Sequence, residues 1–271
     1  TAPSGRILSF IPAKPGAGAS TAAAHFAHAF AETLKKRVAL VDLDLNCGVQ
    51  GVLPQVESKL SLTEIVKRVH RTGSLPAENL ITRAGLVDIF ANDKRSRTAR
   101  LDTSDLEDFL GCLERTYPLV VVDHSGNWER YSVQTLRRSS AVYYVCGADH
   151  LSLALAESGR QLFSEDAVEN VELLLNRADC KGSASPLEAG RSLGLPLSDC
   201  LPNAYSVLQK AARAGSLAPI SSPYGKAVAE AAWRALHSLD LLPADQARAR
   251  PNASSGVLQA LGLSAPAWSR K

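Results

Sequence analysis

A glycine-rich stretch near the amino terminus constrains the fold more than any other feature of the sequence. Residues 13–21 read Ala-Lys-Pro-Gly-Ala-Gly-Ala-Ser-Thr, between an apolar run at 6–12 and an alanine-rich segment at 22–34. In a strand–turn–helix of this kind, backbone N–H groups and a helix N-terminus gather around an anion. The stretch therefore predicts a phosphate-binding loop at the start of an α/β domain.

The loop contains a single cationic side chain, Lys14. A Walker A loop places a lysine directly before its hydroxyl residues, and Ala19 occupies that position here. The missing lysine would make charge-assisted contacts to phosphate, each worth about 1.5–3 kcal/mol, and would act mainly on the transition state of phosphoryl transfer. We therefore expect nucleotide binding to survive, and the chain to be at most a weak ATPase.

Apolar runs of strand length alternate with helical patterns along the chain. The runs are dense in Val, Leu and Ile, which is typical of parallel strands covered on both faces. The expected strands are Val38–Asp44, Val87–Ala91, Leu119–Asp123, Ala141–Gly147 and Val171–Asn176. This order predicts an α/β fold with a doubly wound, mostly parallel sheet flanked by helices, and ligands at the carboxyl ends of its strands.

Helices are expected between these strands. Ser61 followed by Glu64 forms a capping-box pattern, which indicates a helix start. The other expected helices are Thr103–Arg115, Glu129–Arg138, Leu151–Ser164, Pro186–Leu193, Tyr205–Ala214 and Tyr224–Leu239. Residues 1–242 are thus expected to form one domain, and residues 243–271, rich in Pro, Ala and Ser, a tail with one short helix near Val257–Leu263.

Carboxylates follow two of the apolar runs. Asp42 and Asp44 are two residues apart at the end of one run, so their side chains are expected to point the same way. Asp123 follows four apolar residues, as a Walker B carboxylate does, and could hold Mg²⁺ through water because this ion keeps several of its waters. For Asp42 and Asp44 the alternative is a solvated strand end, where Asp and Asn are common, and an apolar strand followed by Asp, as at Asp123, is a common pattern by itself.

Together these motifs resemble the MinD/ParA family of P-loop ATPases, whose deviant Walker A reads Lys-Gly-Gly-x-Gly-Lys-Ser/Thr-Ser/Thr. The resemblance implies that Lys14 reaches across a dimer interface to the partner's nucleotide and takes part in catalysis. Pro15 departs from the family pattern and removes one N–H donor. The loop positions that bind nucleotide under this resemblance are Lys14, Gly16, Ala17, Gly18, Ala19, Ser20 and Thr21.

The resemblance also implies roles for residues around the phosphates. Ser20, Asp42 and Asp123 would form the Mg²⁺ site, Ser20 through its hydroxyl. Asp44 would act in catalysis by orienting the attacking water. Gly126, shortly after the Walker B aspartate, would let the backbone approach the γ-phosphate.

A third group of residues is similar to the family's base-binding elements. The family ends a late strand with Asn-Arg, as found here at Asn176 and Arg177, and the amide would read the adenine edge. An amide donates and accepts at once, which suits adenine's paired donor and acceptor. Pro202 and Asn203 would belong to the loop that packs on the base.

Within the family, residues 12–21, 123–132 and 201–211 look like the CpaE/TadZ branch. That resemblance implies an ATP-binding, nucleotide-gated localisation or assembly factor for Flp-type pilus or secretion machinery, with weak or absent hydrolysis. The implied cofactors are ATP and Mg²⁺, and the implied partners are a second copy, in a homodimer promoted by ATP, and proteins of that machinery. A receiver-like domain is expected ahead of Thr1, in keeping with a chain that contains no methionine.

Two other functions stay open: an active partitioning or positioning ATPase of the ParA/MinD type, and a scaffold that binds no nucleotide. A net charge of +3 makes no strong case for nucleic acid. No apolar run approaches the ~18 residues of a membrane span, so membrane contact is expected to be peripheral if there is any. We expect a cytoplasmic protein with reduced cysteines, which partners recruit to the inner membrane or the cell pole.

Three histidines lie close to these motifs. His25 and His28 are one helical turn apart, but zinc needs three or four protein ligands and no third candidate is evident. His124 directly follows Asp123, and both a phosphate contact and a surface position are open for it.

Overall fold

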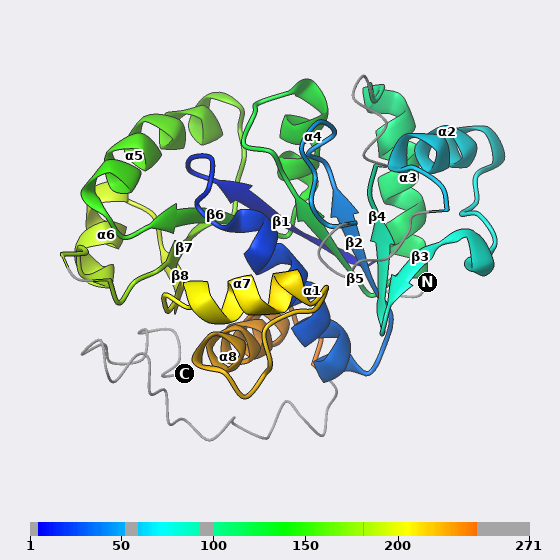
Figure 1. The fold of residues 1–271 in the computed structure, drawn as a ribbon. Helices are drawn as coiled ribbons and strands as arrows, with labels where there is room; N and C mark the ends of the chain where they lie inside the picture. Colours follow the sequence, from blue (N-terminus) through cyan, green and yellow to red (C-terminus); the bar gives the residue numbers. More distant parts are fainter. Residues whose placement is uncertain (1–4, 52–58, 93–99, 181, 243–271) are drawn as a thin grey trace.

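The computed structural model describes residues 5–51, 59–92, 100–180 and 182–242. Within them a single sheet has the strand order β3-β4-β2-β5-β1-β6-β7-β8, and all neighbours are parallel except β3 with β4 (Figure 1). Its strands are β1 (Arg6–Pro12), β2 (Val38–Asp42), β3 (Thr82–Ala84), β4 (Val87–Phe90), β5 (Leu119–Asp123), β6 (Ala141–Gly147), β7 (Val171–Asn176) and β8 (Leu197–Leu201).

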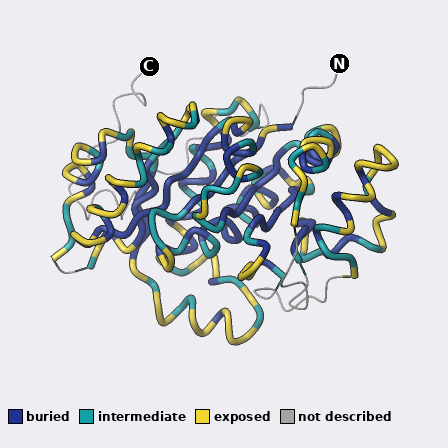
Figure 2. The backbone as a smooth tube through the Cα atoms, turned by 90° about the horizontal axis from the view of Figure 1, so that it is seen from above, coloured by how far each residue is buried: buried dark blue, intermediate teal, exposed yellow. Residues whose placement is uncertain are grey.

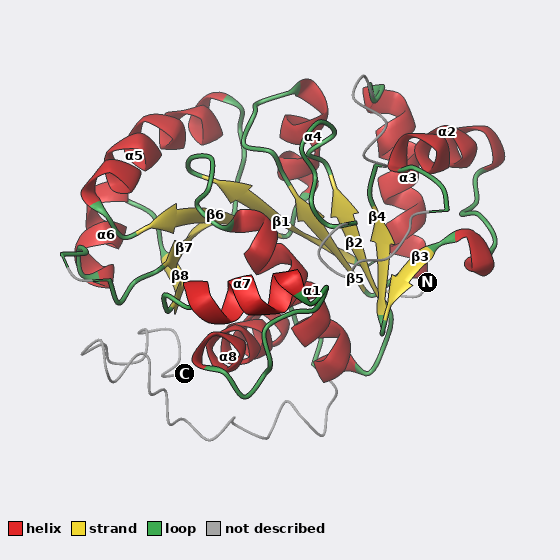
Figure 3. Ribbon diagram, viewed as in Figure 1, coloured by secondary structure: helices red, strands yellow, loops and turns green. Residues whose placement is uncertain are grey.

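Helices cover both faces of this sheet (Figure 3). They are α1 (Ala19–Leu34), α2 (Leu62–Thr72), α3 (Thr103–Thr116), α4 (Arg130–Arg138), α5 (His150–Glu165), α6 (Pro186–Leu193), α7 (Tyr205–Arg213) and α8 (Pro223–Ser238), with a short 3₁₀ helix at Glu78–Leu80. One face carries α1, α7 and α8, and the other carries α2 to α6. The fold is the doubly wound α/β architecture that the alternating pattern predicts.

The buried core forms one layer on each side of the sheet, and in Figure 2 the central strands are dark blue along their length. On the first side, alanines of α1 face alanines of α8, including Ala23, Ala27, Ala231 and Ala232. Because these side chains are small, the two helices approach closely and both reach the sheet. The second side holds larger aliphatic and aromatic side chains, which fill the space beneath α2 and α3.

The expected strands are confirmed, and two further strands were missed. β3 has only three residues, and β8 includes Ser198 and Asp199, so neither gives a continuous apolar run. The capping box at Ser61 and Glu64 is confirmed, with both reciprocal hydrogen bonds present. The expected tail at 243–271, with its short helix, lies outside the described residues.

Two general expectations can be compared with the structure. Cys112, Cys146 and Cys200 are buried and none of the five cysteines forms a disulfide, although Cys47 is exposed. Among the described helices, none combines the length and apolar character needed to cross a membrane.

Candidate functional site

The glycine-rich loop joins β1 to α1 and is shaped by two left-handed glycines. Gly16 has φ +79° and Gly18, the N-cap residue directly before α1, has φ +98°. Between them the Ala17 N–H donates to the Lys14 carbonyl over 3.1 Å. Helix α1 has no side-chain cap and no acidic residue in its first turn. Its first N–H groups lack intrahelical acceptors, so the end of this helix is suited to an anion.

The end of β7 holds the carbonyl side of this loop. Asn176 Nδ2 donates to the Ala17 carbonyl over 2.8 Å, and Arg177 Nη2 donates to the Gly16 carbonyl over 3.1 Å. A Cβ on Gly18 would lie 2.3 Å from Asn176 Nδ2, so this approach requires glycine. The loop's N–H groups other than that of Ala17 remain for a bound anion.

Two aspartates lie side by side next to the loop. Asp42 ends β2, Asp123 ends β5, and the parallel register pairs them directly. Asp42 is 1% exposed and accepts from the backbone N–H groups of Asp44 and Gln50, over 3.1 and 3.0 Å. Burial raises the pKa of Asp42 to about 7. Burial, and then the charge of Asp42, raise the pKa of Asp123 well above its usual range. The two buried carboxylates therefore resist ionisation in the empty site, and a cation beside them would favour their charged forms.

Gln50 connects the elements of the site and was missed by sequence reasoning. Its side chain is fully buried, and Nε2 donates to Asp123 Oδ2 over 2.8 Å and to the Ser20 carbonyl over 2.9 Å. Asp123 Oδ1 and Gln50 Oε1 are buried without a hydrogen-bond partner. No sequence signal indicates Gln50, because it lies six residues beyond the acidic pair in a segment without a pattern.

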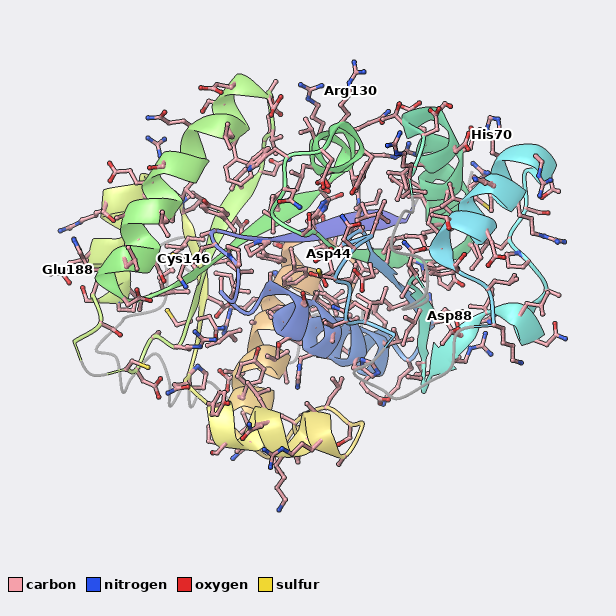
Figure 4. The ribbon with its side chains drawn as sticks, turned by 45° about the horizontal axis from the view of Figure 1, so that its top comes forward. Asp44, His70, Asp88, Arg130, Cys146 and Glu188 are labelled. Carbon is pink, nitrogen blue, oxygen red and sulfur yellow. The ribbon has the colours of Figure 1, made fainter. Side chains whose placement is uncertain are left out.

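Asp44 occupies a more open position than Asp42. It is partly exposed, and its Oδ1 accepts from the backbone N–H groups of Asn46 and Cys47, over 3.2 and 2.9 Å. Figure 4 shows Asp44 near the centre of the view, whereas His70 and Glu188 lie at opposite sides of the molecule. Asp44 thus shapes the turn after β2, and its role toward water stays a prediction.

The base-binding residues predicted from the sequence lie at the ends of β7 and β8. Asn176 is buried and its amide contacts the loop, using one of two N–H groups. Pro202 is buried, while Asn203 is exposed and its N–H donates to Asp179 Oδ1 over 2.5 Å. Because β7 and β8 are parallel neighbours, both groups reach the same sheet edge. Contact with adenine stays a prediction.

Lys14 lies on the side of the loop that faces the start of α5. It is half-buried. The pKa of Asp149, which caps α5, is lowered first by its hydrogen bonds with Ser152 and also by the positive charge of Lys14. The same charge acts on the buried thiol of Cys146, whose pKa burial raises to about 12. The ammonium group is therefore the loop's cationic feature, as predicted, and its contact with a partner subunit is untested.

His124 is directed into the sheet. Its Nε2 lies 3.0 Å from Ser9 Oγ, which lies 2.8 Å from Ser139 Oγ, and the Ser139 hydroxyl donates to the Thr135 carbonyl. Because the Ser139 hydroxyl uses its proton on Thr135, it must accept from the Ser9 hydroxyl. Ser9 in turn accepts from His124, so Nε2 carries the proton of the ring. At 1% exposure the surface alternative is wrong, and burial lowers the pKa of His124 to about 3.

His25 ties the first helix to the segment before α8. Nδ1 lies 2.7 Å from the Thr21 carbonyl, and Nε2 accepts the Ala218 N–H over 3.0 Å. Because Nε2 accepts, Nδ1 carries the proton and the ring is neutral. The ring also meets Tyr224 edge-on. Burial lowers the pKa of His25 to about 4, so its role is structural rather than that of a metal ligand.

We expect a measurable pH dependence from His25. The unfolded chain takes up a proton near the ordinary pKa of 6.5, but folded His25 stays neutral down to about pH 4. Its stabilisation is thus present above pH 6.5 and is lost as the pH falls toward 4. Between pH 7 and pH 5, the stability advantage of wild type over His25→Gln should shrink by about 2 kcal/mol in urea unfolding. A stability difference that stays constant between pH 7 and pH 5 would contradict this assignment.

A cavity of about 250 Å³ lies between α3 and α4 rather than at the loop. It is lined by Leu106, Glu107, Leu110, Gln134, Arg137 and Arg138. Two of its polar groups contact protein partners, since Gln134 Nε2 donates to Glu107 and Arg138 pairs with Glu114, while Gln134 Oε1 is buried without a partner. We therefore place the candidate site at the loop and the adjoining sheet edge, where the sequence motifs meet.

The side chains at this edge offer oxygen ligands for a cation. Among the described residues, no three His, Cys, Asp or Glu side chains form a group that could enclose a metal ion. The available groups are the Ser20 hydroxyl and the paired carboxylates of Asp42 and Asp123, with one buried Asp123 oxygen lacking a partner. Such a set suits Mg²⁺, which keeps several waters and is bound through few protein oxygens together with phosphates.

Comparison with known proteins gives matches only at the level of structure: no protein-family model and no curated protein matches the chain. A ParA family ATPase from Chlorobium tepidum TLS superposes with a TM-score of 0.77 at 21% identity, covering 85% of this chain and 98% of that one. The septum site-determining protein MinD from Pyrococcus horikoshii OT3, complexed with Mg-ADP, gives 0.71 at 19% identity, covering 85% and 95%.

A putative plasmid partition protein from Borrelia burgdorferi B31, bound to AMPPNP, gives a TM-score of 0.68 at 15% identity, with 87% of this chain and 99% of that one covered. At these identities the similarity concerns the fold. It confirms the architecture predicted from the order of the motifs. The chain therefore has the P-loop fold of the ParA and MinD ATPases.

Proposed function

We propose that this protein is a nucleotide-binding, ATP-gated dimeric localisation or assembly factor of the CpaE/TadZ kind, acting on pilus or secretion machinery. The observation that carries the proposal is the junction of the glycine-rich loop with the buried aspartate pair. That junction combines an anion site with a pair of buried carboxyl groups beside it, whose charged forms a cation would favour. Mg²⁺ with a nucleotide matches both at once, since the phosphates meet the N–H groups and the ion meets the carboxylates.

Each part of the site has a task in this proposal. The N–H groups from Gly16 to Ser20, apart from that of Ala17, bind the phosphates, with Thr21 beside the α-phosphate. Ser20, Asp42 and Asp123 hold Mg²⁺, which when bound neutralises phosphate charge. Solved structures with this fold support the ligand class, because one is complexed with Mg-ADP and another is bound to AMPPNP.

The base would lie over the ends of β7 and β8. Asn176 keeps one amide N–H and oxygen lone-pair capacity beyond its contacts with Ala17 and Arg177. Pro202 and Asn203 begin the neighbouring loop and offer an apolar ring and an amide. Gly126, with φ +81°, lets the backbone after Asp123 approach the γ-phosphate.

Slow hydrolysis is part of the proposal. Ala19 supplies no charge at the position of the Walker lysine, and Lys14 is the cation that the loop retains. Asp44 would orient the attacking water, and Lys14 would act on the nucleotide of a second copy. Because Lys14 would contact the nucleotide of the second copy, nucleotide binding and dimerisation are linked.

The pilus assignment rests on the resemblance of residues 12–21, 123–132 and 201–211 to the CpaE/TadZ branch. Partitioning of DNA is the second candidate, since solved structures with this fold include a ParA family ATPase and a putative plasmid partition protein. That activity needs a catalytic cation at the position of the Walker lysine and a basic binding surface, for which Ala19 and a net charge of +3 are unfavourable. We expect the protein to bind cytoplasmic proteins of a pilus machine. We expect no salt-dependent binding to duplex DNA.

We expect ATP with Mg²⁺ to promote a two-fold dimer, and ADP to do so less well. A ligand that binds the dimer more tightly than the monomer must shift assembly by the same free energy. Lys14→Ala should lower the affinity of the ATP-bound dimer by about tenfold, as expected for the loss of a charge-assisted contact. The increase in mass on adding ATP should then be smaller than in wild type. Nucleotide binding to the monomer should change less. Sedimentation with ATP, ADP or neither, beside calorimetry, measures both quantities.

Lys36→Ala is the matched control, since Lys36 is exposed at the far end of α1. It should behave as wild type. A wild-type mass that is independent of nucleotide would contradict the gating. Absence of ATP and ADP binding at millimolar nucleotide would contradict the whole proposal and favour a scaffold that binds none.

A further inference from the structure

Gln50 has contacts that its position in the chain does not explain. It is fully buried, although glutamine is usually exposed. Its backbone N–H donates to Asp42 Oδ2 over 3.0 Å, while its side-chain Nε2 donates to Asp123 Oδ2 and to the Ser20 carbonyl. A single residue thus bonds both members of the acidic pair and the first turn of α1.

These contacts fix the orientation of the amide. Nε2 has two hydrogens, and the contacts with Asp123 and Ser20 use both. Turning the amide over would place its oxygen against a carboxylate oxygen and a carbonyl oxygen, which is unfavourable. Oε1 is therefore directed away from both groups, and it is buried without a partner.

A second unpartnered acceptor lies in the same site. Asp123 Oδ1 is also buried without a hydrogen-bond donor, on the carboxylate whose other oxygen Gln50 holds. Each unsatisfied buried acceptor costs stability, so two of them together need a physical explanation. A ligand that brings several donors and positive charge satisfies both acceptors and the acidic pair. A hydrated divalent cation is such a ligand, because its waters donate while its charge offsets the carboxylates.

We propose that Gln50 is part of the shell of the cation in the nucleotide site. Nε2 holds Asp123 and the start of α1 in position, and Oε1 accepts a hydrogen bond from a metal-bound water. Gln50 is thus a positioning residue for Mg²⁺–nucleotide, and this inference rests on the proposed function. Gln50 is thus a fourth residue at the metal, in addition to the three already assigned, and the sequence motifs do not include it.

The role also couples the segment after β2 to the cation. Asp42 accepts from the backbone of Asp44 and Gln50, and a Cβ on Gly48 would lie 2.4 Å from Asp42 Oδ2. The backbone from 44 to 50 is therefore wrapped closely around this carboxylate. A change in the charge or hydration of Asp42 and Asp123 is therefore expected to shift the backbone of this whole turn.

Gln50→Leu tests the inference by removing the polar atoms at similar volume. Nucleotide affinity is measured by calorimetry for ADP and ATP, each with Mg²⁺ and with excess EDTA. The gain in affinity on adding Mg²⁺ should fall about tenfold in the variant, whereas affinity in EDTA should stay as in wild type. The matched control is Gln161→Leu, at an exposed position on α5, which should keep the full magnesium gain.

Gln50→Glu provides a second arm that retains a polar side chain. A third carboxylate beside Asp42 and Asp123 should tighten binding of the metal alone by about tenfold or more, because cation affinity follows ligand charge. Mn²⁺ without nucleotide is the probe, and the loss of the free-ion signal in electron paramagnetic resonance gives its affinity. Gln50→Leu should bind Mn²⁺ more weakly than wild type.

The outcomes separate the two proposals. If wild type binds nucleotide and Gln50→Leu keeps or enlarges the magnesium gain, Gln50 is outside the cation shell or obstructs it, and this inference is wrong. If wild type binds no nucleotide, the proposed function fails, and the Mn²⁺ arm still decides: equal affinities in wild type and both variants overturn the role of Gln50. Circular dichroism and thermal unfolding show whether the variants are folded.

Discussion

Ala19→Lys is expected to raise the rate of ATP hydrolysis by about 100- to 1,000-fold over wild type. A charged donor aimed at the transferring phosphoryl group acts mainly on the transition state, and one such donor is typically worth that factor. The substitution restores the charge at the first residue of α1, where the Walker lysine stands in related loops. Phosphate release in a single turnover with Mg²⁺ and ATP measures the change.

The same substitution should destabilise the protein without nucleotide. Ala19 is 3% exposed and packs with Leu8 and Phe10 in the core layer beneath α1. A lysine must direct its stem away from this layer and place its ammonium at a helix N-terminus, where the helix dipole opposes a cation by about 0.3–1 kcal/mol. We expect a lower Tm for the empty variant, and a larger rise on adding ATP than in wild type, because binding stabilises the folded state by mass action.

Ala19→Met separates charge from bulk, since methionine is similar in size but neutral. It should share the lower Tm and gain no turnover. Equal acceleration by Met and Lys would mean that packing, not charge, limits the reaction. Turnover of wild type near 1 s⁻¹, on the general enzyme scale, would show that another residue has replaced the missing lysine.

The sheet and the order of the motifs were predictable because each has a local signal. Runs such as Leu119–Asp123 and Ala141–Gly147 are buried on both faces, which leaves continuous apolar residues in the sequence. Strands end where polar residues begin, and parallel strands bring those ends to one edge. The meeting of Asp42, Asp123 and the loop could thus be expected before any contact was known.

The contacts that complete the site have no such signal. Gln50 reaches Asp123 across 73 positions, and Asn176 reaches Ala17 across 159, and neither partner can be found from spacing. His124 could not be placed because its orientation depends on Ser9 in the neighbouring strand. Patterns report which edge a residue belongs to, whereas the direction of its side chain depends on residues distant in sequence.

Asp123→Asn is expected to stabilise the empty protein and to weaken its response to magnesium. Asp123 is fully buried, and burial together with the charge of Asp42 raises its pKa. An acid whose folded pKa is raised contributes most stability at low pH and loses it as the pH rises above the ordinary carboxyl range. The neutral amide removes this penalty, and at pH 8 we expect a gain of ~2 kcal/mol, or roughly 4–8 °C in Tm.

The gain should grow with pH, being small near pH 4 and largest above pH 7, because only the ionised carboxylate is penalised. At the same time the increase in nucleotide affinity on adding Mg²⁺ should fall by about 10- to 100-fold, since an amide gives the metal shell no charge. Asp240→Asn makes the same chemical change at an exposed position and should alter neither quantity. A variant of lower stability that keeps its magnesium response would show that Asp123 supports the fold and not the cation. If Asp123 serves to bind the cation, its replacement must raise the stability of the empty protein and lower the affinity for magnesium.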